Sequence, residues 1–391
     1  MSQIMIDTSA YSVSRQPWLR IALTGDVLPA RALADAGTAQ LHAAEPLFEL
    51  LRNSDLAIGN FEMPLTARGA PLEKLLNIRA DASLAQDLPA MGFDLLNVAN
   101  NHTVDYGWDG LSDTIEAIGS VGVKTVGAGI DLRAASAPSC FEVNGVRVGV
   151  LAWSALLPTG MAATMSRPGL APLHVDTGYE VDAYYQMEEP GDPSAVRIRT
   201  RVRDADRDNA VASIKALRAE VDVLVATVHW GFGSGEELAE YQQPLAEALI
   251  DAGADIVHGH HPHAVHAIGF HRGKPILYSL GTFIGQQIFL PAGDKVQALW
   301  AGMSADGYVA TVDFDAEGDL SVHVTPTTLN TDRLPEVAVG TDFERIVARL
   351  QRLSRPHGAQ VIANGQDVLV RPLASPSRSR IEPATNQLPA F

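Results

Sequence analysis

Residues 221–231, VDVLVATVHWG, give the clearest indication of the fold class. The run Val221–Val228 is mostly apolar and ends in His229, Trp230 and Gly231. A short apolar run that stops at polar or turn-forming residues is typical of a strand buried inside a sheet. We therefore predict a buried strand over Val221–Val228, with His229 at its carboxyl end.

The same pattern recurs on both sides of this stretch. Further apolar runs stop at Gly, Asn, Asp or His, at Leu19–Thr24, Leu56–Gly59, Phe93–Ala99, Arg147–Trp153, Asp255–Val257 and Pro275–Leu280. Helical patterns lie between them, at Leu41–Arg52, Ser83–Met91, Asp109–Ser120, Asp206–Glu220 and Glu237–Ala252. This alternation predicts an α/β fold with a largely buried sheet. Two later runs, Tyr308–Phe314 and Leu320–Thr325, follow each other closely and predict an antiparallel addition.

The composition is that of a globular protein. The 391 residues are 46% hydrophobic and 19% charged, enough for one large domain with extensions or for two domains. A formal net charge of −17 disfavours binding to nucleic acid or to an anionic membrane, so an anionic substrate would need local positive charge, such as bound metal. The single cysteine, Cys140, makes no intrachain disulfide, and we interpret it as a buried small hydrophobe.

The sequence gives no sign of membrane insertion. The first 18 residues have no basic region followed by an apolar region, so we do not expect a signal peptide. No window approaches the roughly 18 uninterrupted apolar residues of a membrane-spanning helix. We expect a cytoplasmic protein, and its oligomeric state cannot be predicted from the sequence.

We expect an N-terminal extension over residues 1–18, one domain over 19–330, and a C-terminal helix and tail over 331–391. Within the domain, Ala155–Thr200 is rich in Pro, Gly and Met, and its first half has no clear periodicity. Long loops inside a domain are uncommon unless they are functional. We therefore predict that this insert borders the active site and sets substrate choice. The end of the tail, Arg371–Phe391, is interpreted as surface-wrapping or disordered.

Several predicted strands end in residues that can bind metal. Asp26 follows the first strand, Glu62 follows the second, and His229 ends the strand over 221–228. Ligands of α/β sheets bind at the carboxyl ends of strands, where loops bring distant positions together. Taken singly, each residue has an ordinary alternative: Asp26 as a helix cap or turn residue, Glu62 as a solvated carboxylate, and His229 as a structural histidine.

The segment Asn100-Asn101-His102 is more informative. The amide oxygen of Asn101 is a reasonable metal ligand, and His102 could act as a general acid or bind an anion. Asp105, three residues later, could orient the imidazole of His102 and hold its tautomer. The alternative is an Asn-rich turn that contains an incidental histidine.

The cluster His258-Gly259-His260-His261-Pro262-His263 is the strongest signal. Six of the twelve histidines fall between His258 and His271. Imidazoles two residues apart on an extended segment face the same way, so His261 and His263 can bind one centre or two adjacent centres. Not all six can be ligands, and we expect His266 and His271 to be ordinary. Whether His258 or His260 is a ligand stays open.

Six motifs now occur in a recognisable order. They are Gly25-Asp26, Asn60-Phe61-Glu62-Met63-Pro64, Ala99-Asn100-Asn101-His102-Thr103-Val104-Asp105, Val228-His229-Trp230-Gly231, Gly259-His260-His261-Pro262-His263 and Tyr278-Ser279-Leu280-Gly281-Thr282-Phe283. Together they resemble the CapA family, named for bacterial poly-γ-glutamate capsule synthesis, over roughly Leu19 to Thr325. The resemblance implies the fold of calcineurin-like metallophosphatases, a four-layer α/β/β/α sandwich with two metal ions at the strand ends.

The resemblance also implies roles for the residues near the N-terminus. Asp26 matches the first metal-binding aspartate, although Leu28 stands where the usual Asp-x-His motif has its histidine. Glu62 stands where a bridging aspartate is expected. Asn101 and His102 match the family's Asn-His pair, with His102 beside the leaving group.

The remaining matches lie in the second half of the chain. His229 matches a single strand-end histidine. His261 and His263 match a Gly-His-x-His pair if His260 occupies the glycine position; alternatively His260 itself belongs to the match, so it stays a candidate ligand. Thr282 departs from the family, which often has Asn there.

The resemblance thus implies a hydrolase with two divalent metal ions, for which Mn, Fe or Zn would suit the mixed nitrogen and oxygen ligands. In this scheme the two ions hold and acidify a water that attacks the substrate. The expected ligands are Asp26, Glu62, Asn101, His229, His260, His261 and His263, and the expected catalytic residues are His102 and Asp105. The substrate would be a small molecule or polymer with a phosphoester or an amide, such as a γ-glutamyl bond. The alternative is a non-catalytic accessory protein in polymer synthesis or export.

Overall fold

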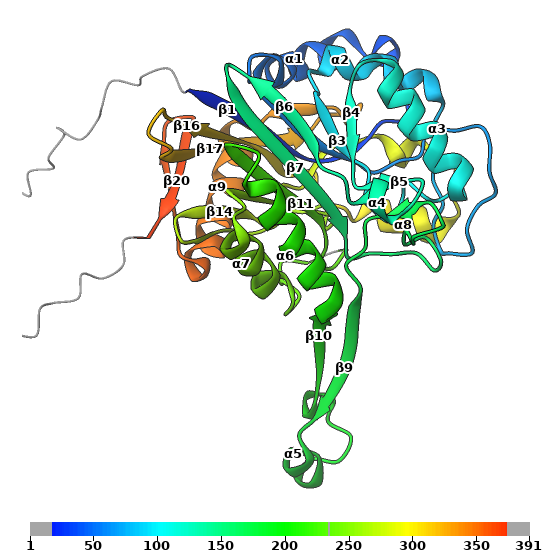
Figure 1. Ribbon diagram of the computed structural model, residues 1–391, viewed down its shortest axis with the longest axis vertical. Coiled ribbons are helices and arrows are strands. Elements are labelled where there is room, and N and C mark those ends of the chain that lie inside the picture. The colour runs from blue at the N-terminus through cyan, green and yellow to red at the C-terminus, as the bar shows by residue number, and fades with distance from the viewer. Residues whose placement is uncertain (1–17, 234, 374–391) are drawn as a thin grey trace, which may run out of the picture.

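Two β-sheets form the centre of the structure, a computed structural model that describes residues 18–233 and 235–373 (Figure 1). The expected N-terminal extension, apart from Trp18, and the expected tail beyond residue 373 lie outside the described residues. In the part of the chain that is described, no helix combines the length and the apolar character needed to cross a bilayer.

The first sheet has ten strands, and its main path runs β19-β20-β17-β16-β1-β2-β3-β4. Strands β1 to β4 are parallel neighbours, whereas β16, β17, β20 and β19 continue the sheet in antiparallel order. The antiparallel addition predicted after the α/β alternation is therefore present. The strands are β1 (Leu19–Leu28), β2 (Leu56–Phe61), β3 (Leu95–Asn97), β4 (Lys124–Val126), β15 (Thr282–Gly285), β16 (Gly307–Phe314), β17 (Leu320–Leu329), β18 (Pro335–Val337), β19 (Ala359–Asn364) and β20 (Asp367–Pro372).

The second sheet has six strands in the order β13-β14-β12-β11-β7-β6. Its four central strands are parallel and both edge strands are antiparallel. The predicted strand over 221–228 is β11, at the centre of this sheet, and all seven of its residues are buried. The strands are β6 (Ser139–Val143), β7 (Val146–Ser154), β11 (Val223–His229), β12 (Ile256–His260), β13 (Ile268–His271) and β14 (Lys274–Leu277).

Side-chain alternation along the strands builds three large apolar cores, and a fourth, small cluster contains Val104, Leu111 and Leu170. Ile21 and Leu23 of β1 share a core with Val148 and Val150 of β7, so the inner faces of the two sheets pack on each other. Ala22 of β1 points the other way, toward helices on the outer face, because successive residues of a strand face opposite sides. These cores confirm the α/β class.

Helices cover the outer faces of both sheets. Helices α1 (Thr38–Arg52), α2 (Leu88–Met91) and α3 (Gly107–Ser120) pack against the first sheet, and α6 (Asp204–Arg218) and α7 (Gln242–Ala252) pack against the second. Helix α9 (Gly340–Ser354) buries its apolar side against the core between the sheets. The shorter elements are β5 (Ala128–Gly129), α4 (Leu132–Ala135), β8 (Gly169–Leu170), β9 (Val175–Val181), α5 (Ala183–Glu188), β10 (Val196–Val202) and α8 (Asp294–Ala301).

Three local expectations differ from the structure. The helix expected over Ser83–Met91 is a 3-10 turn followed by the four-residue α2, which has proline at its second position. The segment after residue 330 contains α9 as expected but also β19 and β20, which join the first sheet through β17. Cys140 is exposed on edge strand β6, so its interpretation as a buried residue was wrong.

The parallel strands of both sheets bring their carboxyl ends to the same region. Asp26 pairs in register with Asn60 of β2, and His229 of β11 pairs with His260 of β12. Two backbone segments also approach each other closely there. A Cβ on Gly25 would lie only 1.8 Å from the carbonyl oxygen of Gly281. Glycine at position 25 therefore lets the loop after β14 approach β1.

Candidate metal centre

Two groups of side chains, all buried except the partly buried His263, lie at these strand ends. Asp26, His229 and His260 form one group, and Glu62, His261 and His263 form the other. In each group the potential ligand atoms all lie within 4.8 Å of one another. The six residues come from β1, β11, β12 and the loops after β2 and β12, so the structure brings together residues that are far apart in the sequence.

The two groups form one continuous centre. Nδ1 of His263 lies 2.9 Å from Oδ2 of Asp26, which joins the groups on one side. Nε2 of His229 lies 3.5 Å from Oε1 of Glu62, and Nε2 of His263 lies 3.6 Å from the same oxygen. The two distances to Glu62 are long for hydrogen bonds but suit atoms that share an ion, whereas His263 and Asp26 lie within hydrogen-bond distance of each other.

The buried carboxylates leave an oxygen without a hydrogen bond. Oε1 of Glu62 is fully buried and accepts no hydrogen bond, and Oδ2 of Asp26 is buried with the imidazole of His263 beside it at 2.9 Å. A buried carboxylate oxygen without a partner is costly unless a cation neutralises it. The donor set of imidazole nitrogens and carboxylate oxygens therefore fits divalent metal ions of the Mn, Fe or Zn type.

Burial also shapes the protonation of this centre. Burial, together with the charge of Asp26, raises the pKa of Glu62 well above its usual range. Burial and neighbouring imidazoles lower the pKa values of His229 and His260 well below the usual range, and lower that of His261 to about 3. Neutral imidazoles present free lone pairs, which is the state that binds metal.

Asn60 is a site residue that the sequence analysis missed. Its Nδ2 donates to Oδ1 of Asp26 at 2.7 Å and to Oε2 of Glu62 at 3.2 Å. Its own Oδ1 accepts from Asn97 at 2.8 Å and from Asn100 at 3.1 Å. The linked amides of Asn60, Asn97 and Asn100 thus hold both carboxylates in position through hydrogen bonds, as residues that orient metal ligands do. Its position two residues before Glu62, on the same side of the extended segment, was the available signal.

The histidine loop has a strained backbone. His261 has φ of 111° and His263 has φ of 51°, values that residues other than glycine rarely adopt. Such conformations cost about 1–3 kcal/mol each and persist where function requires them. The segment that carries His261 and His263 is therefore not extended, as the sequence analysis assumed. Its backbone turns sharply at both residues, and both imidazoles face Glu62.

Asn101 contacts the centre through His229. Its Oδ1 lies 2.6 Å from Nε2 of His229, and its side chain is half-buried. The amide oxygen predicted to be a metal ligand thus lies beside one member of the first group. Thr227 holds the other member, because its hydroxyl lies 2.8 Å from Nε2 of His260.

A second set of charged residues lies next to the centre. Nδ1 of His102 lies 2.9 Å from Oδ2 of Asp105, the pairing that the sequence suggested. Lys74 forms an ion pair with the other carboxylate oxygen of Asp105 and donates to the carbonyl of Asn101 at 2.7 Å. Burial lowers the pKa of His102, and Asp105 opposes that effect. Lys74 was not predicted, because nothing in its local sequence marks it.

The other histidines of the cluster make structural contacts. His258 lies 2.8 Å from the carbonyl of Thr24 and belongs to neither ligand group. His266 contacts the carbonyl of Gly235 at 3.0 Å, and His271 pairs with Asp251 at 2.8 Å. Leu28, at the position of the missing family histidine, is buried in the core beneath α1.

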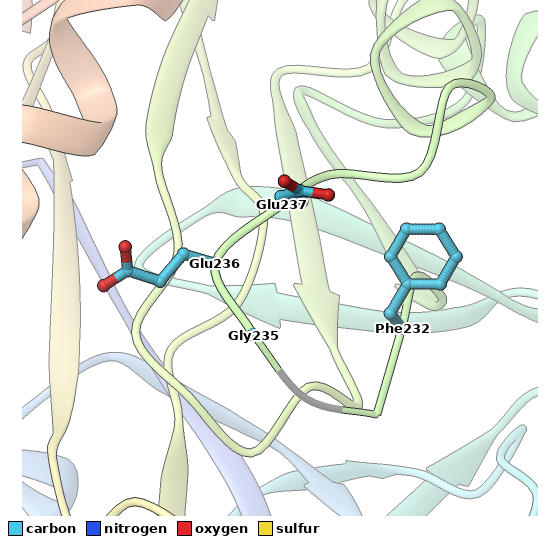
Figure 2. A pocket seen from close by; sticks show the side chains of 4 residues that line it. All are labelled: Phe232, Gly235, Glu236 and Glu237. Atoms are coloured by element: carbon cyan, nitrogen blue, oxygen red, sulfur yellow. The ribbon is translucent and has the colours of Figure 1, made fainter. Parts of the chain in front are cut away.

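Clefts flank the centre on two sides. One of about 680 Å³ is lined by Lys74 and Asn101 and by residues 156–159 of the predicted insert. Another of about 390 Å³ includes His263, Glu236 and Arg349. A third, of about 600 Å³, shares Glu236 and lies along the loop after β11 (Figure 2). The first part of the insert therefore lines a cleft together with Asn101, whereas β9 and β10 project away from the two sheets (Figure 1).

Comparisons with known proteins agree with the motifs. The chain is 31% identical to the PGA biosynthesis protein CapA of Bacillus subtilis over 246 residues, 62% of this chain and 56% of that protein. It is 31% identical to the capsule biosynthesis protein CapA of Bacillus anthracis over 61% of this chain and 52% of that protein. The chain thus spans about half the length of these relatives. A probable polyglutamine synthesis accessory protein of Mycobacterium tuberculosis is 29% identical over 81% of this chain and 77% of its own length.

The match to a family model covers a much longer stretch of the chain than any single motif does. The sequence model described as bacterial capsule synthesis protein PGA_cap matches residues 20–287, which include every predicted site residue. The resemblance to the CapA family is thereby confirmed. This chain belongs to the PGA_cap family of bacterial capsule synthesis proteins.

Proposed function

We propose that this chain is a metal-dependent hydrolase with two divalent ions. One observation carries the proposal: two adjoining groups of three potential ligands, all buried except the partly buried His263, with an oxygen of Glu62 that no protein donor satisfies. Two adjacent buried carboxylates oppose folding unless a positive charge compensates them, because burial and mutual repulsion both disfavour their ionised forms. Bound divalent ions would supply that charge.

The ligand roles divide between the two groups. Asp26, His229 and His260 would hold one ion, and Glu62, His261 and His263 would hold the other. Asn60 fixes the orientation of both carboxylates, and Asn101 meets the centre beside His229. When bound, the ions would polarise the scissile group and lower the pKa of a water nucleophile.

The protein's own acid would be His102. Asp105 orients its imidazole and Lys74 holds Asp105 in place, so the free ring nitrogen can serve the substrate. His102 would then donate a proton to the leaving group. Lys74 and Asn101 also line the adjoining cleft, which gives an anionic substrate one local cation on a chain of net charge −17.

The substrate would be a phosphoester or an amide. The Bacillus relatives are named for PGA and capsule biosynthesis, which favours a γ-glutamyl amide in a small molecule or a polymer. The fold implied by the family resemblance favours a phosphoester. The clefts on either side of the centre leave room for a substrate that extends beyond the reacting bond.

The test combines elemental analysis with a substrate screen. Purified protein is analysed for Mn, Fe and Zn, and its turnover is measured on phosphoesters and on γ-glutamyl amides, before and after chelation. We expect close to two ions per chain and a hydrolysis that chelation abolishes and added metal restores. Absence of bound metal after incubation with each ion would refute the proposal.

The alternative is a non-catalytic accessory protein of polymer synthesis. The Mycobacterium tuberculosis relative is named as a probable polyglutamine synthesis accessory protein, which favours this alternative. The two functions differ in one measurable respect. A chain that binds two ions tightly but hydrolyses neither substrate class, while it binds γ-glutamyl polymer, would support the accessory role.

A further inference from the structure

The cleft of about 390 Å³ beside His263 has walls from two parts of the chain. One wall belongs to the candidate centre, because it contains His263 and the neighbouring Pro262. The other wall comes from α8, from the turn after it with Ser304, and from Arg349 of α9. A small molecule that fills this cleft therefore lies next to both a potential metal ligand and a guanidinium group.

Arg349 lies between two carboxylates that other arginines already hold. Glu236 accepts two hydrogen bonds from Arg352, of 2.9 Å and 2.8 Å. Asp306 likewise accepts two from Arg345, of 3.1 Å and 2.5 Å. The contacts of Arg349 are longer, with its Nε 3.2 Å from Oε1 of Glu236 and its Nη1 3.4 Å from Oδ2 of Asp306. Arg349 is therefore the cation on which these two carboxylates depend least.

Most hydrogen-bond donors of Arg349 have no partner in the described part of the chain. A guanidinium carries five N–H donors in one plane, and of these only Nη1 makes a hydrogen bond to the described residues. The side chain of Arg349 is nevertheless only 26% exposed. Donors that are partly withdrawn from water and unpaired are costly, so a ligand that accepts their hydrogen bonds would stabilise them. A carboxylate fits this planar fork with both of its oxygens.

The rest of the cleft favours an aliphatic ligand. Most of its lining has no polar side-chain atom, as shown by Pro262, Ala264, Ala298, Leu299, Gly302 and Met303. A sugar or a nucleobase would leave polar groups unpaired against such a surface, whereas a short aliphatic stem would not. The cleft therefore suits a short aliphatic stem that carries a carboxylate.

We propose that Arg349 determines substrate specificity by binding a carboxylate that a short aliphatic stem separates from the reacting bond. This inference rests on the proposed hydrolase function and adds a substrate class to it, an acyl group with an anionic end, of which glutaryl and γ-glutamyl groups are examples. Helix α8 and Arg349 lie beyond residues 20–287, which the family model matches. The reacting bond and the anionic end of the substrate thus contact different parts of the chain.

The first experiment compares two substrates that differ only in the carboxylate. Glutaryl p-nitroanilide ends in a carboxylate, and butyryl p-nitroanilide has the same stem without it. We expect the metal-loaded wild-type chain to prefer the glutaryl substrate by at least about tenfold in kcat/KM, mainly through KM, since one charge-assisted contact has that effect. Arg349→Gln should abolish the preference. Arg349→Lys should retain part of it, because lysine keeps the charge but not the planar fork.

Glu236→Gln is the matched control, because it breaks the same ion pair from the other side. It removes the carboxylate that competes with the substrate for Arg349, so it should strengthen the preference for the glutaryl substrate. A purely structural ion pair would give both variants the same effect. The preference is a ratio measured within one protein, so partial unfolding of a variant does not alter it. A wild type without preference, or a preference that falls in both variants, would overturn the proposal.

The second experiment measures binding without turnover. Glutaramate has an amide at one end and a carboxylate at the other, and butyramide lacks the carboxylate. Ligand-observed NMR gives their dissociation constants for the chelated chain, in which no metal competes for the carboxylate. We expect tighter binding of glutaramate in the wild type and no such difference in Arg349→Gln.

The two experiments separate this inference from the proposed function. If glutaramate binds through Arg349 but neither anilide is hydrolysed, the carboxylate site stands and the hydrolase function fails. If both anilides are hydrolysed equally and the chelated chain does not distinguish glutaramate from butyramide, the hydrolase function stands and the role of Arg349 is refuted.

Discussion

Asp26 and His263 meet at 2.9 Å although they belong to different sheets. Asp26 lies near the end of β1 in the first sheet, and His263 lies in the loop after β12 of the second. The candidate centre is therefore built across the junction of the two sheets. Any ion held there would connect them, so its binding and the stability of the junction are linked.

The first prediction concerns the histidine loop. His261→Ala should lower bound metal markedly, because the variant removes one of the three potential ligands in the group of Glu62, His261 and His263. His266→Ala is the matched control, since it removes another histidine of the same loop that contacts only the carbonyl of Gly235 among the described hydrogen bonds. Elemental analysis of both purified variants makes the comparison. Equal metal contents in His261→Ala and wild type would exclude His261 as a ligand.

The second prediction concerns metal removal. Chelation should lower the midpoint of thermal unfolding, because a ligand at 1,000 times its dissociation constant stabilises a protein by about 4 kcal/mol. Re-addition of Mn or Zn should restore the midpoint. Thermal unfolding of loaded, chelated and reloaded protein measures this effect. If the three midpoints coincide, the two ligand groups do not hold ions that contribute to stability.

The third prediction is that the effect of Glu62→Gln on the stability of the protein changes sign when metal is bound. Burial and Asp26 raise the pKa of Glu62 above its ordinary 4.5, so above that pH ionisation of Glu62 opposes folding of the metal-free chain. Glu62→Gln should therefore match or exceed the stability of the wild type after chelation. With metal present, the same variant should be the less stable protein. Unfolding curves of both proteins in both states test this crossover; a variant that is less stable in both states would show that Glu62 is structural.

The α/β class could be predicted from the sequence because each of the recognised strands is a local apolar run that ends at a polar or turn-forming residue. β11 and its terminal His229 were recognisable from eleven residues alone. Asp26, Glu62 and four histidines, His229, His260, His261 and His263, were predicted to meet because parallel strands end at the same side of a sheet. The division into two groups of three was not predictable, since it depends on the positive φ values of His261 and His263.

Other features could not be predicted from the sequence, because they depend on how segments distant in the chain pack together. Lys74 lies on an irregular segment, and only the fold shows that it reaches Asp105. Asn60 was quoted within a motif but had no role, because its partners Asn97 and Asn100 belong to another strand end. The insert was predicted to be one loop. Its second half is instead a hairpin, in which apolar and charged side chains alternate along β9 and β10.

The fourth prediction tests the close approach at Gly25. A Cβ there would overlap the carbonyl of Gly281, a backbone atom that cannot rotate away. Gly25→Ala should therefore destabilise the chain by several kcal/mol or prevent folding, as overpacking of a tight site does. Gly119→Ala, in helix α3 with open space around it, should be neutral or stabilising by up to about 1 kcal/mol. Denaturant unfolding of both variants decides, and a Gly25→Ala protein of wild-type stability would contradict the close approach.

The last prediction concerns His102, which we expect to act on the substrate rather than on the metal. The imidazole contacts Asp105 and belongs to neither ligand group, so His102→Ala should keep its fold and most of its metal. Loss of a general acid typically costs about 10²–10⁴-fold in rate. The loss should shrink for substrates whose leaving group needs no proton.

Asp105→Asn should have a milder effect on turnover, since it disturbs only the orientation of His102. It also removes the charge that Lys74 faces, so its cost in stability should exceed that of His102→Ala. Turnover, metal content and unfolding midpoint are measured for both variants, with substrates of graded leaving-group pKa. If His102→Ala loses its metal together with its activity, His102 is a ligand, because a proton donor outside the coordination sphere leaves the metal content unchanged.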